Sequence, residues 1–76
     1  MRPMSDIYVI AHINTEMWKK HEKEILKRLG KPGYSKISGL YYLRRIGWIA
    51  ETKEESLKIQ LVLMSFGAEN IMAAPQ

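Results

Sequence analysis

A short run of mainly apolar positions near the start of the chain is followed by a segment in which apolar positions recur with a helical period. Residues 7–13 are rich in β-branched and aromatic side chains and are too few for a helix, so they predict a first strand. Residues 17–29 repeat apolar side chains at every fourth position, which is typical of an amphipathic helix. This helical stripe consists of Met17, His21, Ile25 and Leu29, joined by Trp18 and Leu26.

The second half of the chain predicts a hairpin, a second helix and a last strand. We expect a strand over residues 37–43, because apolar and aromatic side chains are dense there. Residues 44–47 read Arg-Arg-Ile-Gly, which is typical of a tight turn with glycine in its last position. Residues 48–52 then return as a third strand, residues 53–66 predict the second helix, and residues 70–74 predict the last strand.

Capping residues mark the ends of both predicted helices. Asn14 or Thr15 can accept hydrogen bonds from the free N–H groups that begin the first helix. Gly30 suits the left-handed position that follows the last turn of this helix. Thr52 and Glu55 form a capping box, in which the threonine oxygen accepts from the backbone of Glu55 and the carboxylate reaches back. These signals predict both helices from local sequence alone.

The order of these elements is β-α-β-β-α-β, and it predicts the fold class. Strands and helices that alternate in this order suggest an α+β protein, a ferredoxin-like sandwich with two helices on one face of a four-stranded antiparallel sheet. The length of 76 residues fits one domain, so we expect residues 1–76 to form a single ferredoxin-like unit. A different α+β arrangement with a swapped last strand is the alternative.

Alternation along the strands predicts which side chains face the helices. In the first strand the aliphatic set Ile7, Val9, Ala11 and Ile13 suits the helix side, and the other set suits the open face. In the third strand we expect Ile49 under the helices and Trp48, Ala50 and Thr52 on the open face. The second strand leaves Tyr41 and Tyr42 as alternatives, because a shift of one residue exchanges them. The candidate binding or interface residues are Tyr8, Ile10, His12, Tyr41, Tyr42 and Trp48.

The second predicted helix has two apolar stripes. Leu57, Leu61 and Met64 form one stripe, and Ile59, Leu63 and Phe66 form another on nearly the opposite side. One stripe can face the sheet, while the other can pack on the first helix or on another subunit. We expect Leu61, together with Ile25 of the first helix, to be a core position.

The amino-acid composition limits the ways in which so small a domain can be stabilised. The chain has no cysteine, which excludes disulfides and thiolate zinc sites, and two histidines cannot build a structural zinc site alone. We therefore expect no metal and no cofactor, and oligomerisation remains as the usual way to stabilise a small domain. An exposed face with several aromatic side chains points the same way, since such a patch exceeds what monomers normally leave open. We expect a homodimer.

Charge and hydropathy exclude some further classes of protein. The formal net charge of +4 attracts polyanions mildly, but Lys and Arg are spread along the chain and form no single block. The longest aliphatic run, residues 61–64, is far shorter than the roughly 20 residues that span a membrane. We expect no membrane association and a cytoplasmic protein. Only two Asn and two Gln occur among many Lys, Glu and Ile, which favours a thermophilic source.

His12 is the candidate for acid–base chemistry. It is the only residue of the predicted open face whose pKa suits proton transfer near neutrality, and Tyr8 shares that face. A His–Tyr pair in a pocket enclosed by a dimer could do such work. A structural histidine at an interface is the favoured interpretation, because no base–nucleophile set lies near it. His21 is interpreted as a partly buried packing residue on the helix stripe.

One resemblance is to RNA-recognition-motif domains, which have the same element order. Residues 7–10 resemble the first-strand motif of that family, with Tyr8 at the aromatic position. Residues 44–51 resemble its third-strand motif but place Ile46 and Glu51 where aromatics belong. The resemblance implies single-stranded RNA binding through Tyr8 and Trp48, and the two departures disfavour it. The positions of the third-strand motif that match are Arg44, Gly47, Trp48 and Ile49.

A second resemblance covers nearly the whole chain. The pattern of residues 8–12, the compact hairpin and residues 47–51 resemble small proteins of the dimeric α+β-barrel superfamily in element order and length. That resemblance implies two sheets that meet through their open faces, with the helices outside and a cavity between the sheets. In some members such a cavity serves small-molecule chemistry or ligand binding. A shared fold does not by itself assign that chemistry.

Together these observations favour a homodimeric small-molecule-binding or interaction module assembled through its sheet face. A single-stranded RNA-binding domain that uses Tyr8 and Trp48 is the alternative. A small acid–base enzyme with a pocket at His12 is the second alternative, and a non-catalytic protein is favoured over it. The sequence does not identify a ligand, a reaction or a biological process.

Overall fold

The described part of the chain forms its strands and helices in the predicted order. A computed structural model describes residues 6–37 and 42–75. The strands and helices follow the order β-α-β-β-α-β, which the hydrophobic pattern of the sequence predicted. The elements are β1 (Ile7–Asn14), α1 (Thr15–Leu29), β2 (Tyr34–Ile37), β3 (Leu43–Ala50), α2 (Lys53–Ser65) and β4 (Glu69–Pro75).

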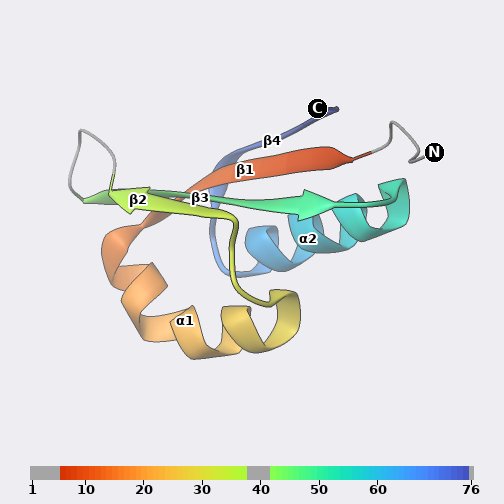
Figure 1. Ribbon diagram of the computed structural model, residues 1–76. Coiled ribbons are helices and arrows are strands. Elements are labelled where there is room, and N and C mark those ends of the chain that lie inside the picture. The colour runs from red at the N-terminus through yellow and green to blue at the C-terminus, as the bar shows by residue number, and fades with distance from the viewer. Residues whose placement is uncertain (1–5, 38–41, 76) are drawn as a thin grey trace.

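The strands form one antiparallel sheet in the order β2-β3-β1-β4. Both helices lie on the same side of this sheet, and the described residues form no layer over the opposite side (Figure 1). This order, with helices on one face only, is the ferredoxin-like α+β fold that the sequence predicted. The alternative with a swapped last strand is excluded, because β4 pairs with β1 at the edge of the sheet. Neither helix is long and apolar enough to cross a membrane.

The caps of α1 form as predicted. The side chain of Asn14 accepts hydrogen bonds from the backbone N–H groups of Glu16 (2.8 Å) and Met17 (3.3 Å), so it satisfies two donors that the helix leaves free. At the other end Gly30 has a φ of 78°, a conformation that side chains with a Cβ rarely adopt, and its N–H donates to the carbonyl of Leu26 at 2.8 Å. The local sequence therefore sets both ends of this helix.

The capping box of α2 also forms. The Thr52 hydroxyl accepts from the backbone N–H of Glu55 at 3.0 Å, as the sequence predicted. The Glu55 carboxylate reaches back to accept from the N–H of Glu51 at 2.7 Å. With this box in place, the chain turns from β3 directly into α2.

The core lies between the sheet and the two helices. On the sheet side it uses alternate residues of β1 and β3, and each helix contributes a few side chains that are almost completely buried. His21 of α1 is half-buried and its ring lies 5.1 Å from the ring of Phe66, so the predicted packing role is confirmed. The buried apolar residues are Val9, Ala11, Ile13, Trp18, Ile25, Ile46, Trp48, Ala50, Ile59 and Leu63.

The predicted hairpin is wrong in its position. Residues 44–47 do not form a turn, because Leu43–Ala50 is one continuous strand that pairs with β1 over its whole length. The preceding strand is Tyr34–Ile37, so β2 begins three residues before the predicted strand. The physical reason is that the long partner strand β1 provides hydrogen bonds for a long β3, and Gly47 serves packing inside that strand. Much of the predicted second strand, residues 38–41, lies outside the described residues.

The predicted faces of the third strand are also wrong. Trp48 pairs with Val9, whose side chain is buried under the helices, and Trp48 itself is only 4% exposed. Its indole N–H donates to the carbonyl of Gly30 at 3.0 Å, which satisfies the one polar group of the ring. Ile49 is instead on the open face and is 50% exposed, while Ala50 is buried. The prediction failed because the register of a strand decides which of its residues face the core. An error of one residue in the register exchanges the two faces.

Helix α2 has two apolar stripes, and the structure buries the stripe of Ile59 and Leu63, not the stripe that contains Leu61. Ile59 and Leu63 are buried against the sheet, whereas Leu61 is 63% exposed. The expectation that Leu61 is a core position is therefore wrong, while the same expectation for Ile25 is confirmed at 0% exposure. The other members of the exposed stripe are Leu57 and Met64.

Strand β4 contains a bulge that affects the open face. The register between β1 and β4 shifts between Ile10 and His12, and Asn70 takes a φ of 52° at this point. Asparagine is among the few residues other than glycine that adopt this conformation readily. The extra residue lets Ile71 pack on the core while Glu69 stays opposite His12.

Candidate functional site

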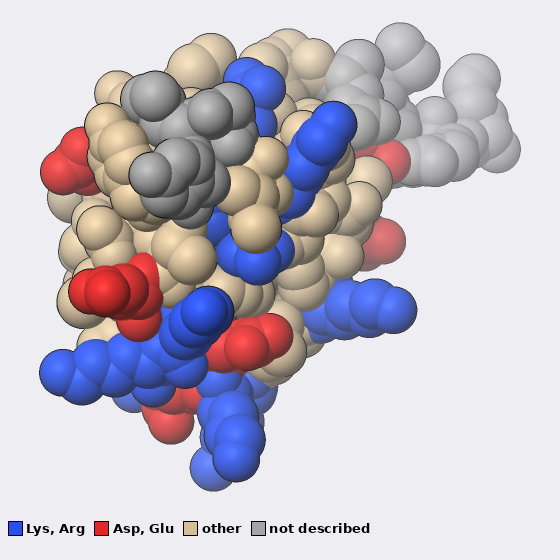
Figure 2. Space-filling model, turned by 90° about the vertical axis from the view of Figure 1, so that its left-hand side faces the viewer, with Lys and Arg blue, Asp and Glu red and all other residues tan. Residues whose placement is uncertain are grey.

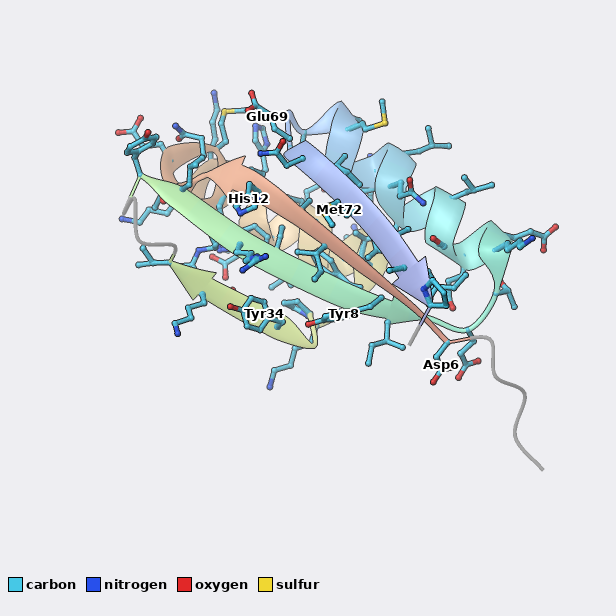
Figure 3. All side chains as sticks on the ribbon, turned by 90° about the horizontal axis from the view of Figure 1, so that it is seen from above. Asp6, Tyr8, His12, Tyr34, Glu69 and Met72 are labelled. Atoms are coloured by element: carbon cyan, nitrogen blue, oxygen red, sulfur yellow. The ribbon has the colours of Figure 1, made fainter. Side chains whose placement is uncertain are left out.

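The candidate site is the face of the sheet that no helix covers, which we call the open face (Figure 3). Residues that are direct partners in neighbouring strands project from the same side of a sheet. The strand register therefore arranges the open face in three rows that run across the strands.

The first row is charged, and we call it the polar row. Across the sheet from β2 to β4 it consists of Lys36, Arg45, His12 and Glu69, each the direct partner of the next. The two cations lie on the β2–β3 side and the carboxylate lies on β4, so the row has opposite charges at its two ends. His12 lies between Arg45 and Glu69.

The other two rows are mainly apolar. The middle row consists of Tyr34, Gly47, Ile10 and Met72, and the apolar row consists of Ile49, Tyr8 and Ala74. Met72 is 64% exposed and Ile49 is 50% exposed, although both are large apolar side chains. The open face therefore leaves substantial apolar surface in contact with water.

Tyr8 and Tyr34 meet above a glycine. A Cβ atom added to Gly47 would lie 3.2 Å from the Tyr8 hydroxyl oxygen and 3.3 Å from a carbon of its ring, so this ring lies across the glycine. Tyr34 is the direct partner of Gly47 on β2. Figure 3 shows the two tyrosines side by side on the open face. An aromatic ring that covers a glycine in the neighbouring strand shields its backbone from water.

We expect Gly47→Ala to destabilise the protein by about 1–3 kcal/mol, the usual effect of overpacking. The new methyl would also lie 3.2 Å from the backbone oxygen of Val9, which cannot move independently of β1. Gly33→Ala is the matched control, because nothing lies within 4 Å of a Cβ built there. Both changes affect the unfolded chain alike. Urea denaturation measures both, and equal stability of the two variants would contradict the packing of Tyr8 on Gly47.

His12 has an atom that the described residues do not satisfy. Its Nδ1 is buried and has no hydrogen-bond partner among them. Buried polar atoms normally have partners, so an unsatisfied nitrogen at this position is an unusual feature of the fold. The imidazole lies in the polar row, between a cation and a carboxylate.

The geometry does not form the His–Tyr pair considered from the sequence. Tyr8 and His12 are four residues apart in β1, which corresponds to about 13 Å along a strand. They also belong to different rows, with Ile10 between them. In the described part of the chain, no group of three His, Cys, Asp or Glu side chains is placed to hold a metal ion.

The predicted site residues have different outcomes. Tyr8, Ile10 and His12 lie on the open face as predicted, whereas Trp48 lies in the core. Tyr42 is 53% exposed and precedes β3, where its carbonyl accepts from the N–H of Thr15 at 2.8 Å. Tyr41 lies outside the described residues.

Sequence reasoning missed much of the open face. Tyr34 was placed before the predicted second strand, and the β3 residues were assigned to a turn or to the helix side. A prediction that started the second strand at Tyr34 could have found it, since Tyr-Ser-Lys-Ile alternates and follows Pro-Gly. The missed residues of the face are Tyr34, Lys36, Arg45, Ile49, Glu69 and Met72.

The fold and this open face together define a ferredoxin-like α+β protein with an uncovered, partly aromatic sheet surface. Comparison of the chain with protein-family models, with curated proteins and with solved structures gives no match in any of the three. The function is therefore argued from the site.

Proposed function

We propose that the protein acts as a homodimeric binding module in which two copies meet through their open faces. The observation that supports this most is that the open face combines two uncovered apolar rows with a polar row that is positive at one end and negative at the other. Burying apolar surface gives about 25 cal/mol per Å², which favours covering Met72 and Ile49. The arrangement of charges favours a second copy of the chain as the surface that covers them.

The charges of the polar row suit a twofold axis that lies in the interface and runs parallel to the strands. Such an axis places β2 of one copy over β4 of the other, and keeps each row opposite itself. Lys36 then lies opposite Glu69 of the second copy, and the reverse contact repeats it. The interface thereby gains two ion pairs at its rim.

The same axis also brings apolar side chains together. It places Tyr34 opposite Met72 of the second copy, so an aromatic ring meets a large exposed apolar side chain. It places Ile49 opposite Tyr8 of the second copy, which brings two apolar side chains together. An axis perpendicular to the strands would instead set the polar row against the apolar row, so Lys36 and Glu69 would lose their ion pairs and face apolar side chains.

In this dimer the His12 side chain lies in the polar row, which lines the space between the two sheets. Arg45 of the second copy lies opposite His12, so this part of the interface has hydrogen-bond donors and a positive charge. These groups suit a small polar ligand or ordered water enclosed between the sheets. Binding is the proposed role, because the described residues near His12 include no nucleophile positioned beside it.

The charge-reversal experiment tests both the dimer and its axis. We expect sedimentation equilibrium to give twice the monomer mass of 8.9 kDa. Lys36→Glu and Glu69→Lys should each weaken association by roughly 5–30-fold, because each places like charges at two symmetric contacts worth about 0.5–1 kcal/mol apiece. The double variant should restore association, since it exchanges the charges and keeps the pairs.

Two results would contradict the proposal. A wild-type protein of 8.9 kDa at every concentration would exclude the dimer, and a double variant weaker than both single variants would exclude this axis.

If a monomer also binds single-stranded RNA with an affinity that falls steeply with salt, the open face is a nucleic-acid surface. In that case Tyr8 and Tyr34 are the stacking residues, since Trp48 is in the core.

A further inference from the structure

A second site lies on the helix side of the sheet, away from the open face. A cleft of about 410 Å³ opens between α1, the segment that follows it, β2 and β3. A volume of this size accommodates a small organic molecule. The charged and polar side chains that line the cleft are Lys19, Glu22, Lys31, Ser35 and Arg44.

The lining of the cleft is positively charged. Three cations, Lys19, Lys31 and Arg44, line it together with a single carboxylate, that of Glu22. The helix that forms one wall has further lysines along its length, and Figure 2 shows Lys and Arg side chains gathered on this side of the molecule, over α1. A cleft with one predominant sign of charge raises the local concentration of ions of the opposite sign.

Arg44 is held in a fixed position at this cleft. Its Nη1 donates to the hydroxyl oxygen of Ser35 at 2.9 Å, and its guanidinium carbon lies 5.8 Å from the centre of the Trp18 ring. These two contacts restrain both the plane and the direction of the guanidinium group. A restrained guanidinium is preorganised to bind the two oxygens of a carboxylate or phosphate.

Arg44 also lacks a counterion among the residues that the structure describes. Its side chain is half-buried, and its Nε is buried with no hydrogen-bond partner. No carboxylate of the described chain forms an ion pair with it, including Glu22, which lines the same cleft. A partly buried cation without an anion is unfavourable, and an anionic ligand would remove that cost.

Apolar side chains complete the cleft. Trp18, Leu26 and Pro32 line it beside the charged groups. Leu26 and Pro32 are half-buried and provide a surface for the hydrocarbon part of a ligand, Trp18 is buried beneath them as the floor, and the cations provide a position for the charged group.

We infer that this cleft binds a small organic anion. Its carboxylate or phosphate pairs with Arg44, and its apolar part lies against Trp18, Leu26 and Pro32. The site is separate from the open face, because Arg44 and Arg45 are consecutive in β3 and project from opposite sides of the sheet. The inference therefore stands whether or not the protein is a dimer.

A titration followed by NMR tests the inference with benzoate, phenyl phosphate and the neutral isostere benzamide as probes. We expect saturable changes in the Trp18 indole N–H and Arg44 Nε–H signals with at least one of the two anions. Benzamide should bind at least about tenfold more weakly, because it has no charge to pair with the guanidinium. Whichever anion binds more tightly identifies the preferred oxyanion.

The key variant is Arg44→Met, which keeps an unbranched side chain over Trp18 and removes the charge. It should lower the affinity for the better anion by about tenfold or more. Lys23→Met is the control, since it removes a positive charge from α1 at an exposed residue that does not line the cleft, and it should change the affinity by less than about twofold. Equal effects of the two variants would overturn the site, because they would show only general attraction of anions.

Two further outcomes would also overturn the inference. One is the absence of saturable binding by both anions, and the other is unchanged binding by Arg44→Met, which would leave Arg44 with a packing role alone. Arg44→Lys provides a second test if Arg44→Met fails to fold, because lysine keeps the charge but lacks the planar fork. We expect it to bind the anion at least about threefold more weakly, and unchanged affinity would contradict the role of the guanidinium.

Discussion

Ile25→Ala is expected to lower the free energy of unfolding by roughly 2–5 kcal/mol, the range for truncating a large buried aliphatic side chain. Ile25 is 0% exposed and lies in the cluster that α1 shares with the sheet. Truncation removes its buried methyl and methylene groups and leaves a cavity that close-packed neighbours fill only in part. In a domain this small, such a loss is a large fraction of the total stability.

Leu61→Ala is the matched control for this prediction. Leu61 is also a large aliphatic residue in a helix, but it is 63% exposed, so we expect its truncation to change stability by less than about 0.5 kcal/mol. Urea denaturation at several protein concentrations measures both variants and separates the loss of folding from the loss of association. A loss of more than about 2 kcal/mol for Leu61→Ala would mean that the exposed stripe of α2 is covered in the native assembly.

Ile49→Glu is expected to abolish the dimer. Ile49 is 50% exposed on the open face, and the proposed axis places it opposite Tyr8 of the second copy. The substitution would bury one carboxylate on each side of the interface without a cation beside it, which costs several kcal/mol. We expect sedimentation equilibrium to show the monomer mass of 8.9 kDa at concentrations where the proposal expects the wild type to be a dimer.

Leu61→Glu separates the open face from the other exposed apolar surface. It introduces the same charge at a residue of comparable exposure on the outer side of α2, so it should leave the dimer intact. Circular dichroism must show that both variants keep the wild-type fold. If Leu61→Glu dissociates the protein and Ile49→Glu does not, the interface lies on α2, and the proposed pairing of open faces is wrong.

Local signals in the sequence were sufficient for the element order and for most of the first half of the fold. The alternation in residues 7–13 predicted β1 and its two faces, because one face is wholly aliphatic and the other includes Tyr8 and His12. The ends of α1 were predictable from Asn14 and Gly30, since capping depends on side chains and backbone conformations within a few residues. The same is true of Thr52 and Glu55 at the start of α2.

The candidate site was only partly predictable for the same reason. Tyr8, Ile10 and His12 were found because β1 has a clear alternation of its own. Glu69 joins this face only through pairing with His12, which is distant in the sequence, so no local pattern marks it. Tyr34 begins a short alternating segment, but its place on this face depends on pairing with Gly47. The bulge at Asn70 is a further example, because it places Glu69 opposite His12 by adding a residue to the register.

The tertiary structure decided which face of an element is buried wherever the local sequence pattern allowed two answers. Strand β3 has large apolar residues on both of its faces. Only its pairing with β1 therefore determines that Trp48 enters the core and Ile49 faces outward. In α2 two apolar stripes compete for the sheet, and only the packing of the assembled layers selects Leu63 over Leu61. The sequence determined where strands and helices form, because those signals are local. The tertiary structure determined which of two equally apolar faces is buried, because that choice depends on contacts between elements distant in the chain.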